Sequence, residues 1–175
     1  MTDKVTVALA QLDFIVGDVE GNTQKILDNC QRARSEIQAD LVVFPELSIC
    51  GYPPEDLLFH SGLRARIAQA VETIRTAVRE TAVMFGYPEH DGDSIYNSAV
   101  VFKDGVCLAR YRKSLLPNYR VFDEKRYFCP GTKPCVVEVD GVRLGITICE
   151  DIWHDGPVEE SAAAGANLVG NLNAS

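Results

Sequence analysis

Residues 142–148 place the strongest restriction on the fold, because every second residue from Val142 to Ile148 is aliphatic. A period of two is the pattern of a β-strand with one face in a core. Cys149 stands where this strand ends, and Glu150 and Asp151 follow it directly. Reactive groups of α/β proteins gather at such strand ends, although most cysteines of this kind are small buried hydrophobic residues. The stretch alone leaves both interpretations of Cys149 open.

Strands and helices alternate along most of the chain. Short apolar runs predict strands, and apolar residues three or four apart predict helices. The first helix is expected to begin at Asp18 or Asn22, either of which can cap it, and its apolar stripe includes Ile37. The predicted strands cover residues 5–10, 41–44, 82–86, 98–102, 106–111, 135–139, 142–148 and 168 onward, and the predicted helices include residues 26–37, 63–78 and 157–164.

This order of segments predicts one α/β domain. The 175 residues contain no linker, repeat or low-complexity segment and are enough for a substantial core. Helices alternating with strands and Asp-Gly hairpins favour a mixed sheet covered by helices. Residues 112–134 form a long polar stretch rich in aromatic residues, and loops of that length tend to be functional. The chain stops in what reads as an interior strand, so we expect the front part of a larger domain.

Charge and composition argue against several classes of protein. The net charge of −8 disfavours a nucleic-acid groove, which needs clustered cations. No apolar run approaches the ~20 residues that span a bilayer, and the first residues do not resemble a signal peptide, so we expect a cytoplasmic protein. The six cysteines form no Cys-x-x-Cys pair and have no histidine at zinc-ligand spacing. We therefore expect reduced thiols and no metal site.

Two more polar residues follow predicted strands. Glu46 comes after residues 41–44, and Lys113 comes after residues 106–111. Taken singly, Glu46 reads as a capping or solvated acid and Lys113 as a solvated lysine. The three histidines offer no evident general base, because nothing near them in the sequence supplies an orienting group. Together with Cys149, however, these residues place an acid, a cation and a thiol at the ends of three different strands.

Five blocks of sequence resemble the nitrilase superfamily of carbon–nitrogen hydrolases. Residues 44–47 (FPEL), 111–113 (YRK) and 148–151 (ICED) are similar to its three catalytic blocks and occur in the same order. Residues 51–58 (GYPPEDLL) and 116–128 (LPNYRVFDEKRYF) resemble the glutaminase domains of the glutamine-dependent NAD+ synthetases. The resemblance covers essentially the whole chain. It implies an α-β-β-α sandwich with mixed sheets, here incomplete at its C-terminal side.

The resemblance also implies the roles of the site residues. Cys149 would be the nucleophile, Glu46 the general base and Lys113 the electrostatic stabiliser of the tetrahedral intermediate. Glu124 matches a second glutamate that orients the lysine, although by itself it reads as an ordinary exposed acid. These roles suit an amide substrate, because a thioester splits a difficult hydrolysis into two easier steps.

Four further residues match substrate-binding positions of the family. Tyr119 and Phe122 match residues that line the glutamine pocket, although loop packing explains them equally well. Glu150 matches a residue that holds the amino-acid end of glutamine. Ser175 falls where a Ser-Pro segment of the family begins, and this match is the weakest because the sequence stops there.

The resemblance implies partners for residues 1–175 as well. Glutamine would be the substrate, and no cofactor would be needed for its hydrolysis. ATP and Mg2+ would belong to a synthetase domain of the full-length chain, whose glycine-rich ATP-binding motif does not occur here. We therefore expect a truncated glutaminase domain, a homo-oligomer, and no nucleic-acid or membrane partner. The alternatives are a stand-alone amidase acting on an ω-amide or N-carbamoyl compound, or an inactive truncated module that serves assembly.

Overall fold

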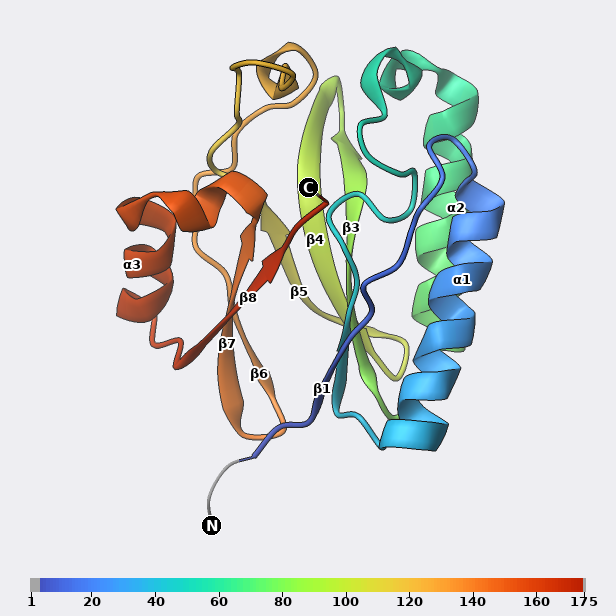
Figure 1. Cartoon of the computed structure of the whole chain (residues 1–175), viewed down its shortest axis with the longest axis vertical. Helices are drawn as coiled ribbons and strands as arrows, with labels where there is room; N and C mark the ends of the chain where they lie inside the picture. The colour runs from blue at the N-terminus through green and yellow to red at the C-terminus, as the bar shows by residue number, and fades with distance from the viewer. Residues whose placement is uncertain (1–3, 175) are drawn as a thin grey trace.

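The computed structural model describes residues 4–174, which form two β-sheets packed face to face between helices (Figure 1). The larger sheet has the strand order β1-β2-β3-β4-β5, with β1 to β3 parallel and β3 to β5 antiparallel. The smaller sheet has the order β6-β7-β8, and β8 is parallel to β7. The strands are β1 (Val7–Leu9), β2 (Leu41–Val43), β3 (Ala82–Asp91), β4 (Ser94–Lys103), β5 (Val106–Arg112), β6 (Val136–Val139), β7 (Val142–Ile148) and β8 (Leu168–Leu172).

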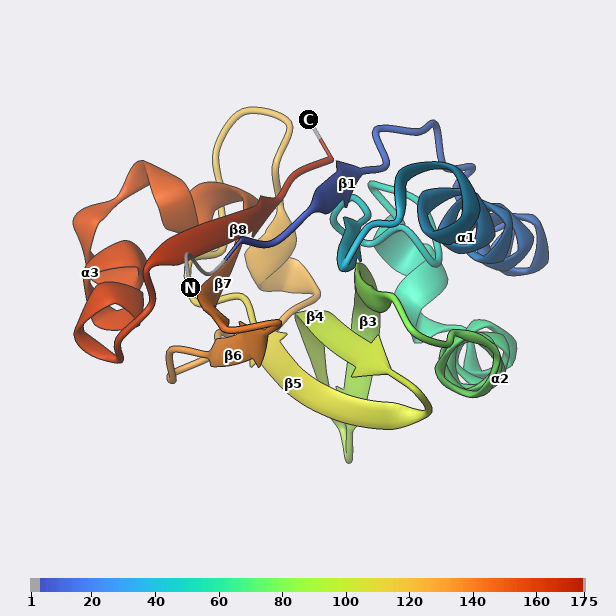
Figure 2. The ribbon, with the colours of Figure 1, turned by 90° about the horizontal axis from the view of Figure 1, so that it is seen from below.

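Helices lie on the two outer sides of this pair of sheets. Figure 2 shows α1 and α2 beside the five-stranded sheet and α3 beside the three-stranded sheet. The layers are therefore α-β-β-α, and the predicted sandwich with mixed sheets is confirmed. The α-helices are α1 (Val19–Arg32), α2 (Ser61–Ala77) and α3 (Asp155–Ala163), and the shorter turns are a π-helix (Ala33–Ile37) and 3-10 helices at Glu55–Phe59, Glu124–Arg126 and Cys149–Trp153.

The alternation of side chains along the central strands builds two cores. On β3, Val83 and Phe85 pack with the buried faces of α1 and α2. Ala82 and Met84 point the other way and pack with Leu144 and other residues of the second sheet. Both faces of β3 are thus covered, which explains why its residues read as a continuous apolar run. The strand ends between the two sheets are consequently shielded from water.

Three details differ from the sequence prediction or refine it. Strand β3 extends to Asp91 and β4 begins at Ser94, so both are longer than predicted. Ile37 is 54% exposed, because the α-helix gives way to a π-helix and the apolar stripe loses its register. Asp18 is the residue that caps α1, accepting from the backbone N–H of Gly21 over 3.0 Å.

Asn22, the other predicted cap, is buried instead. Its side chain bonds the backbone of Ile15 and Ile49, so it fastens the start of α1 to the loop after β2. Among residues 4–174, no helix has the length and apolar character needed to cross a membrane.

Candidate active site

Glu46 lies three residues beyond the end of β2 and is 2% exposed. The turn that carries it touches Gly86 of β3. A Cβ on Gly86 would lie 2.3 Å from the backbone nitrogen of Leu47 and 2.8 Å from the Cα of Glu46. Glycine alone leaves room for this approach. Leu47 has a φ of 50°, a conformation costly for a residue with a Cβ, so the close packing holds the turn in place.

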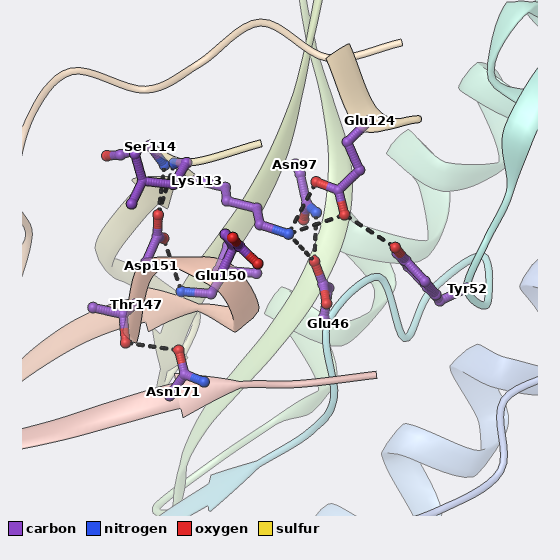
Figure 3. A network of polar contacts seen from close by, with 12 residues as sticks. Glu46, Tyr52, Asn97, Lys113, Ser114, Glu124, Thr147, Glu150, Asp151 and Asn171 are labelled. Atoms are coloured by element: carbon purple, nitrogen blue, oxygen red, sulfur yellow. Dashed lines mark hydrogen bonds and ion pairs between the residues drawn. The ribbon is translucent and has the colours of Figure 1, made fainter. Parts of the chain in front are cut away.

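Lys113 follows β5 directly and reaches the Glu46 carboxylate (Figure 3). Its backbone N–H donates to the carbonyl oxygen of Asn97 over 2.8 Å. Its Nζ lies 2.8 Å from Glu46 Oε1 and 2.9 Å from Glu124. The lysine is 0% exposed, so this ammonium is held entirely between two carboxylates. A buried charge requires such partners.

Glu124 is the second carboxylate of this cluster and is 4% exposed. It opens the 3-10 turn Glu124–Arg126, and its Oε1 also accepts from the Tyr52 hydroxyl over 3.1 Å. Burial raises the pKa of Glu124, as does the charge of Glu46, and Lys113 opposes the rise. The interpretation of Glu124 as an ordinary exposed acid is therefore wrong.

The charges of this cluster act on Lys113 in turn. Burial alone would lower the pKa of Lys113, but Glu46 and Glu124 outweigh it and raise the pKa above its ordinary range. Cys149 contributes to the same rise, which puts its sulfur within electrostatic reach of the ammonium. Lys113 is thus a permanent cation at the meeting point of three strand ends.

Cys149 occupies the junction between β7 and the 3-10 turn Cys149–Trp153. It is 7% exposed and has a φ of 46°, in the left-handed region that few residues with a Cβ adopt. A strand that turns this sharply into a helical segment presents the residue at the turn to the space above the sheet. Cys149 therefore sits at the end of β7, where its charge acts on Lys113 of the first sheet.

The two acids after Cys149 take separate directions. Asp151 is fully buried, and its carboxylate accepts from the Tyr111 hydroxyl and from the backbone N–H groups of Ser114, Leu115 and Ile148, over 2.8–3.1 Å. Burial raises the pKa of Asp151, and these hydrogen bonds oppose the rise. The Asp151 carboxylate is thus held by four neutral donors and fixes the turn that begins at Cys149.

Glu150 contacts Tyr119 and His154. Its Oε2 accepts from the Tyr119 hydroxyl over 2.8 Å, and its Oε1 lies 3.2 Å from Nε2 of His154. His154 therefore does have a carboxylate partner, which the sequence did not reveal. A cavity of about 750 Å³ is lined by Tyr119, Glu150 and His154 among others. The structure thus brings together two of the predicted substrate-binding residues.

Phe122 packs against Tyr119 but lines a second cavity. Its ring meets the Tyr119 ring edge-on, with centroids 5.7 Å apart. Phe122 and Glu124 line a cavity of about 640 Å³ with Tyr52. The two hollows flank the loop that follows β5. Ser175 lies outside the described residues.

Three residues of the site had no role predicted from the sequence: Asn97, Tyr52 and Asp151. Asn97 Nδ2 donates to Glu46 Oε1 over 2.8 Å. A signal for Asn97 existed, since a polar residue beside an apolar strand that is covered on both faces needs a buried partner. Tyr52 and Asp151 lie within blocks that resemble the family, but the sequence gave neither residue a partner or a role.

Comparison with known proteins identifies the family of this chain. A family model described as carbon-nitrogen hydrolase matches residues 6–175. A glutamine-dependent NAD(+) synthetase of Xanthomonas campestris is 48% identical over 171 residues, which cover 97% of this chain and 31% of that protein. The Thermotoga maritima protein of the same name is 43% identical, over 98% of this chain and 30% of its own length. The chain spans about a third of the length of these curated relatives.

Solved structures show the same fold. The glutamine-dependent NAD+ synthetase from Acinetobacter baumannii, in complex with ADP, matches with a TM-score of 0.93 and 41% identity, over 98% of this chain and 32% of that one. An amidase of the nitrilase superfamily from Nesterenkonia matches with a TM-score of 0.89 and 28% identity, over 99% of this chain and 66% of that one. In a mutant of that amidase, the acetamide moiety of fluoroacetamide is added covalently to the active-site cysteine.

Proposed function

This chain belongs to the carbon–nitrogen hydrolase family, and we propose that it is the part of a glutamine-dependent NAD+ synthetase that hydrolyses glutamine and releases ammonia. One observation carries the proposal. Lys113 is buried between Glu46 and Glu124, and Cys149 lies at the facing strand end. Hydrolysis of a carboxamide requires a nucleophile, a proton carrier and a positive charge near the developing oxyanion. The cluster contains all three.

In the first half of the proposed reaction, the sulfur of Cys149 attacks the side-chain amide carbon of glutamine. The thiol proton passes to Glu46, and the tetrahedral intermediate forms with a negative oxygen. Glu46 then gives the proton to the departing nitrogen, so that ammonia leaves and a thioester remains. One carboxylate thus serves as base and then as acid.

In the second half, water attacks the thioester carbon. Glu46 takes a proton from that water, and the collapse of the second tetrahedral intermediate releases glutamate. The proton returns to the sulfur of Cys149, which restores the starting state. Lys113 is suited to stabilise both oxyanions, because its ammonium has three N–H groups and the two carboxylates occupy only two directions. The backbone N–H of Glu150 could supply a second donor.

Tyr119, Phe122 and Glu150 would hold the substrate. The Glu150 carboxylate is suited to the α-ammonium group of glutamine, and the aromatic pair of Tyr119 and Phe122 lies beside it. We also propose Ser175 as a contact to the substrate, on the family resemblance alone. The glutaminase step needs no cofactor in this scheme.

The remaining part of the proposal concerns the whole protein. Ammonia would amidate nicotinic acid adenine dinucleotide in a synthetase domain that uses ATP and Mg2+ and lies outside residues 1–175. Five of the cysteines, namely Cys30, Cys50, Cys107, Cys129 and Cys135, are free thiols, which supports a reducing compartment such as the cytoplasm. We also propose a homo-oligomer, and the exposed side chains of Val121 and Trp153 support a contact between copies.

A stand-alone amidase acting on an ω-amide or N-carbamoyl compound is the second candidate. The likeness to the Nesterenkonia amidase favours it, whereas the higher identity to the synthetases favours glutamine. Turnover of a panel of small amides by the intact natural protein separates the two. Preference for glutamine over aliphatic amides and N-carbamoyl amino acids is expected.

The Cys149→Ala variant of the intact natural protein tests the proposed chemistry. Hydrolysis of glutamine should fall about 10⁴-fold or more, because members of a nucleophile–base unit act together. Synthesis of NAD+ from added ammonia should continue. The control is Cys107→Ala, which removes an exposed thiol and should preserve both activities. Loss of both activities in Cys149→Ala would instead make Cys149 a structural residue.

Labelling gives a second, direct test of the nucleophile. A diazo-ketone analogue of glutamine should form an adduct on Cys149 that mass spectrometry can locate. The absence of any adduct in folded protein would support the inactive assembly module in place of an enzyme.

A further inference from the structure

Asn97 of β4 contacts both members of the acid–ammonium pair. Its Nδ2 donates to Glu46 Oε1 over 2.8 Å. Its backbone carbonyl oxygen accepts from the backbone N–H of Lys113 over 2.8 Å. Asn97 is fully buried, and its backbone is paired with Pro88 on one side and bonded by Lys113 on the other. One residue thus fixes the side chain of the acid and the main chain of the lysine (Figure 3).

The contact between Asn97 and Glu46 makes the two oxygens of the carboxylate different. A carboxylate only accepts hydrogen bonds, so the amide nitrogen of Asn97 must face it. The oxygen that accepts from Asn97, Oε1, also accepts from Lys113 Nζ over 2.8 Å. The other oxygen, Oε2, is buried and has no hydrogen-bond partner. Two donors therefore gather on one oxygen, and the second keeps its lone pairs.

Glu124 shows a related arrangement around the same lysine. Lys113 Nζ donates to Oε1 of Glu124 over 2.9 Å and lies 2.9 Å from Oε2, which is buried and makes no hydrogen bond. The neutral donor of Glu124 is Tyr52, whose hydroxyl reaches Oε1 over 3.1 Å. Each acid therefore has one oxygen with two donors and one oxygen with none, and the neutral donor that selects the oxygen is Asn97 for Glu46 and Tyr52 for Glu124.

We infer that Asn97 is a positioning residue that directs Oε2 of Glu46 to be the oxygen that takes and returns the proton. This inference rests on the proposed function. A hydrogen bond from a neutral amide holds one oxygen of Glu46 without adding a second cation. The carboxylate is therefore oriented before the thiol proton of Cys149 arrives. Without Asn97, Lys113 alone would hold Glu46, and rotation about the last side-chain bond would exchange the two oxygens.

Two variants of the intact natural protein test this inference. Asn97→Asp keeps the shape of the side chain but replaces the donor by a negative group against Glu46. We expect kcat/KM for glutamine to fall about 10²–10³-fold, and the acid limb of its pH profile to move up by about one pH unit or more. Asn97→Ala removes the donor without adding charge. We expect kcat to fall about 10–100-fold with KM nearly unchanged, because Asn97 touches no part of the substrate in this scheme.

Ser98→Ala is the matched control. Ser98 is the next residue on β4 and is also fully buried, and its hydroxyl donates to Glu89 over 2.7 Å, outside the cluster around Lys113. This variant should lose a buried hydrogen bond and some thermal stability, yet keep the wild-type pH profile. The loss of one buried hydrogen bond is thereby separated from a change at Glu46.

Several outcomes would overturn the inference about Asn97. A folded Asn97→Asp protein with the wild-type pH profile would do so, and so would a loss confined to KM in Asn97→Ala. If neither Asn97 variant folded while Ser98→Ala did, Asn97 would be a structural residue only. Absence of glutamine hydrolysis by the wild-type protein would instead refute the proposed function, and the inference with it.

Discussion

The two sheets contribute to the site in different ways. The five-stranded sheet supplies Glu46 and Lys113, whose buried side chains bond each other directly. The three-stranded sheet supplies Cys149 on a turn whose backbone is strained. Asp151 of that turn accepts hydrogen bonds from Ser114 and Leu115, the two residues after Lys113. The larger sheet thus builds a charged cluster, and the Asp151 carboxylate fastens the turn that carries Cys149 to the two residues after Lys113.

This difference separates two requirements of a cysteine hydrolase. The acid and the ammonium must keep fixed positions, and direct ion pairing in a buried place achieves that. The sulfur must lie close to them, because it has to attack the substrate. Holding its turn through Asp151 positions the sulfur while leaving its chemistry to the cluster. Variants that act on one sheet at a time can test this division.

The largest effect on folding is expected from Lys113→Met, which leaves Glu46 and Glu124 buried with no cation between them. Removal of one partner from a buried ion pair costs about 3–5 kcal/mol. The control is Lys103→Met, which breaks a partly exposed ion pair with Asp140 and should cost about 0–1 kcal/mol. Urea denaturation measures both. Equal losses in the two variants would mean that the buried cluster is no more coupled than a surface pair.

The junction between the sheets is tested by Asp151→Asn. The Asn side chain keeps one acceptor, but its NH2 group would face donors that now bond the carboxylate. We expect a loss of about 2–3 kcal/mol, typical of a hydrogen bond to a charged group, together with slower alkylation of Cys149 by iodoacetamide. Tyr111→Phe removes only one of the four donors and should cost about 1 kcal/mol.

If Asp151→Asn and Tyr111→Phe lowered stability equally, the backbone donors would contribute little. Asp151 would then not be the main fastening between the turn that carries Cys149 and the residues after Lys113. If the Asp151→Asn protein were destabilised but Cys149 were alkylated at an unchanged rate, Asp151 would stabilise the fold without positioning Cys149.

Much of the fold followed from local patterns in the sequence. The order of strands and helices was predicted correctly because β7, β3 and the two long helices carry strong apolar periods. The extension of β3 through Glu89 to Asp91 was missed, since a charged residue in a buried strand is not expected. Glu89 is tolerated there because Arg112, on the other side of β4, pairs with it over 2.7 Å. Such a partner is not visible in a local window.

The site was predicted unevenly for the same reason. Glu46, Lys113 and Cys149 each follow an apolar run, so their places at strand ends were visible, and the family resemblance joined them. Asn97 and Asp151 do their work through partners 36–51 residues away in the sequence. Only the folded arrangement of the two sheets could reveal those contacts.

The smallest expected effect is a difference in how two buried acids, Glu124 and Glu89, make the stability of the protein depend on pH. Burial raises the pKa of Glu124 above its ordinary value of 4.5, and the single cation beside it is shared with Glu46. Burial would also raise the pKa of Glu89, but hydrogen bonds from Arg112 and Ser98 outweigh it and lower the pKa below 4.5. The two acids should therefore affect stability on opposite sides of pH 4.5.

The direction in which each acid makes stability depend on pH can be measured with Glu124→Gln and Glu89→Gln. A raised pKa in the folded state means that the contribution of Glu124 is present below pH 4.5 and is lost as the pH rises through its folded pKa. A lowered pKa means that the contribution of Glu89 is present above pH 4.5 and is lost as the pH falls. Urea denaturation between about pH 3 and pH 8 gives the free energy of unfolding as a function of pH. This free energy should change less with pH above pH 4.5 in Glu124→Gln, and less below pH 4.5 in Glu89→Gln. If both variants changed the pH dependence of the unfolding free energy in the same way, the contrast between Glu124 and Glu89 would be contradicted. The acid that shares a lysine and the acid that has its own arginine would then be in equivalent electrostatic environments.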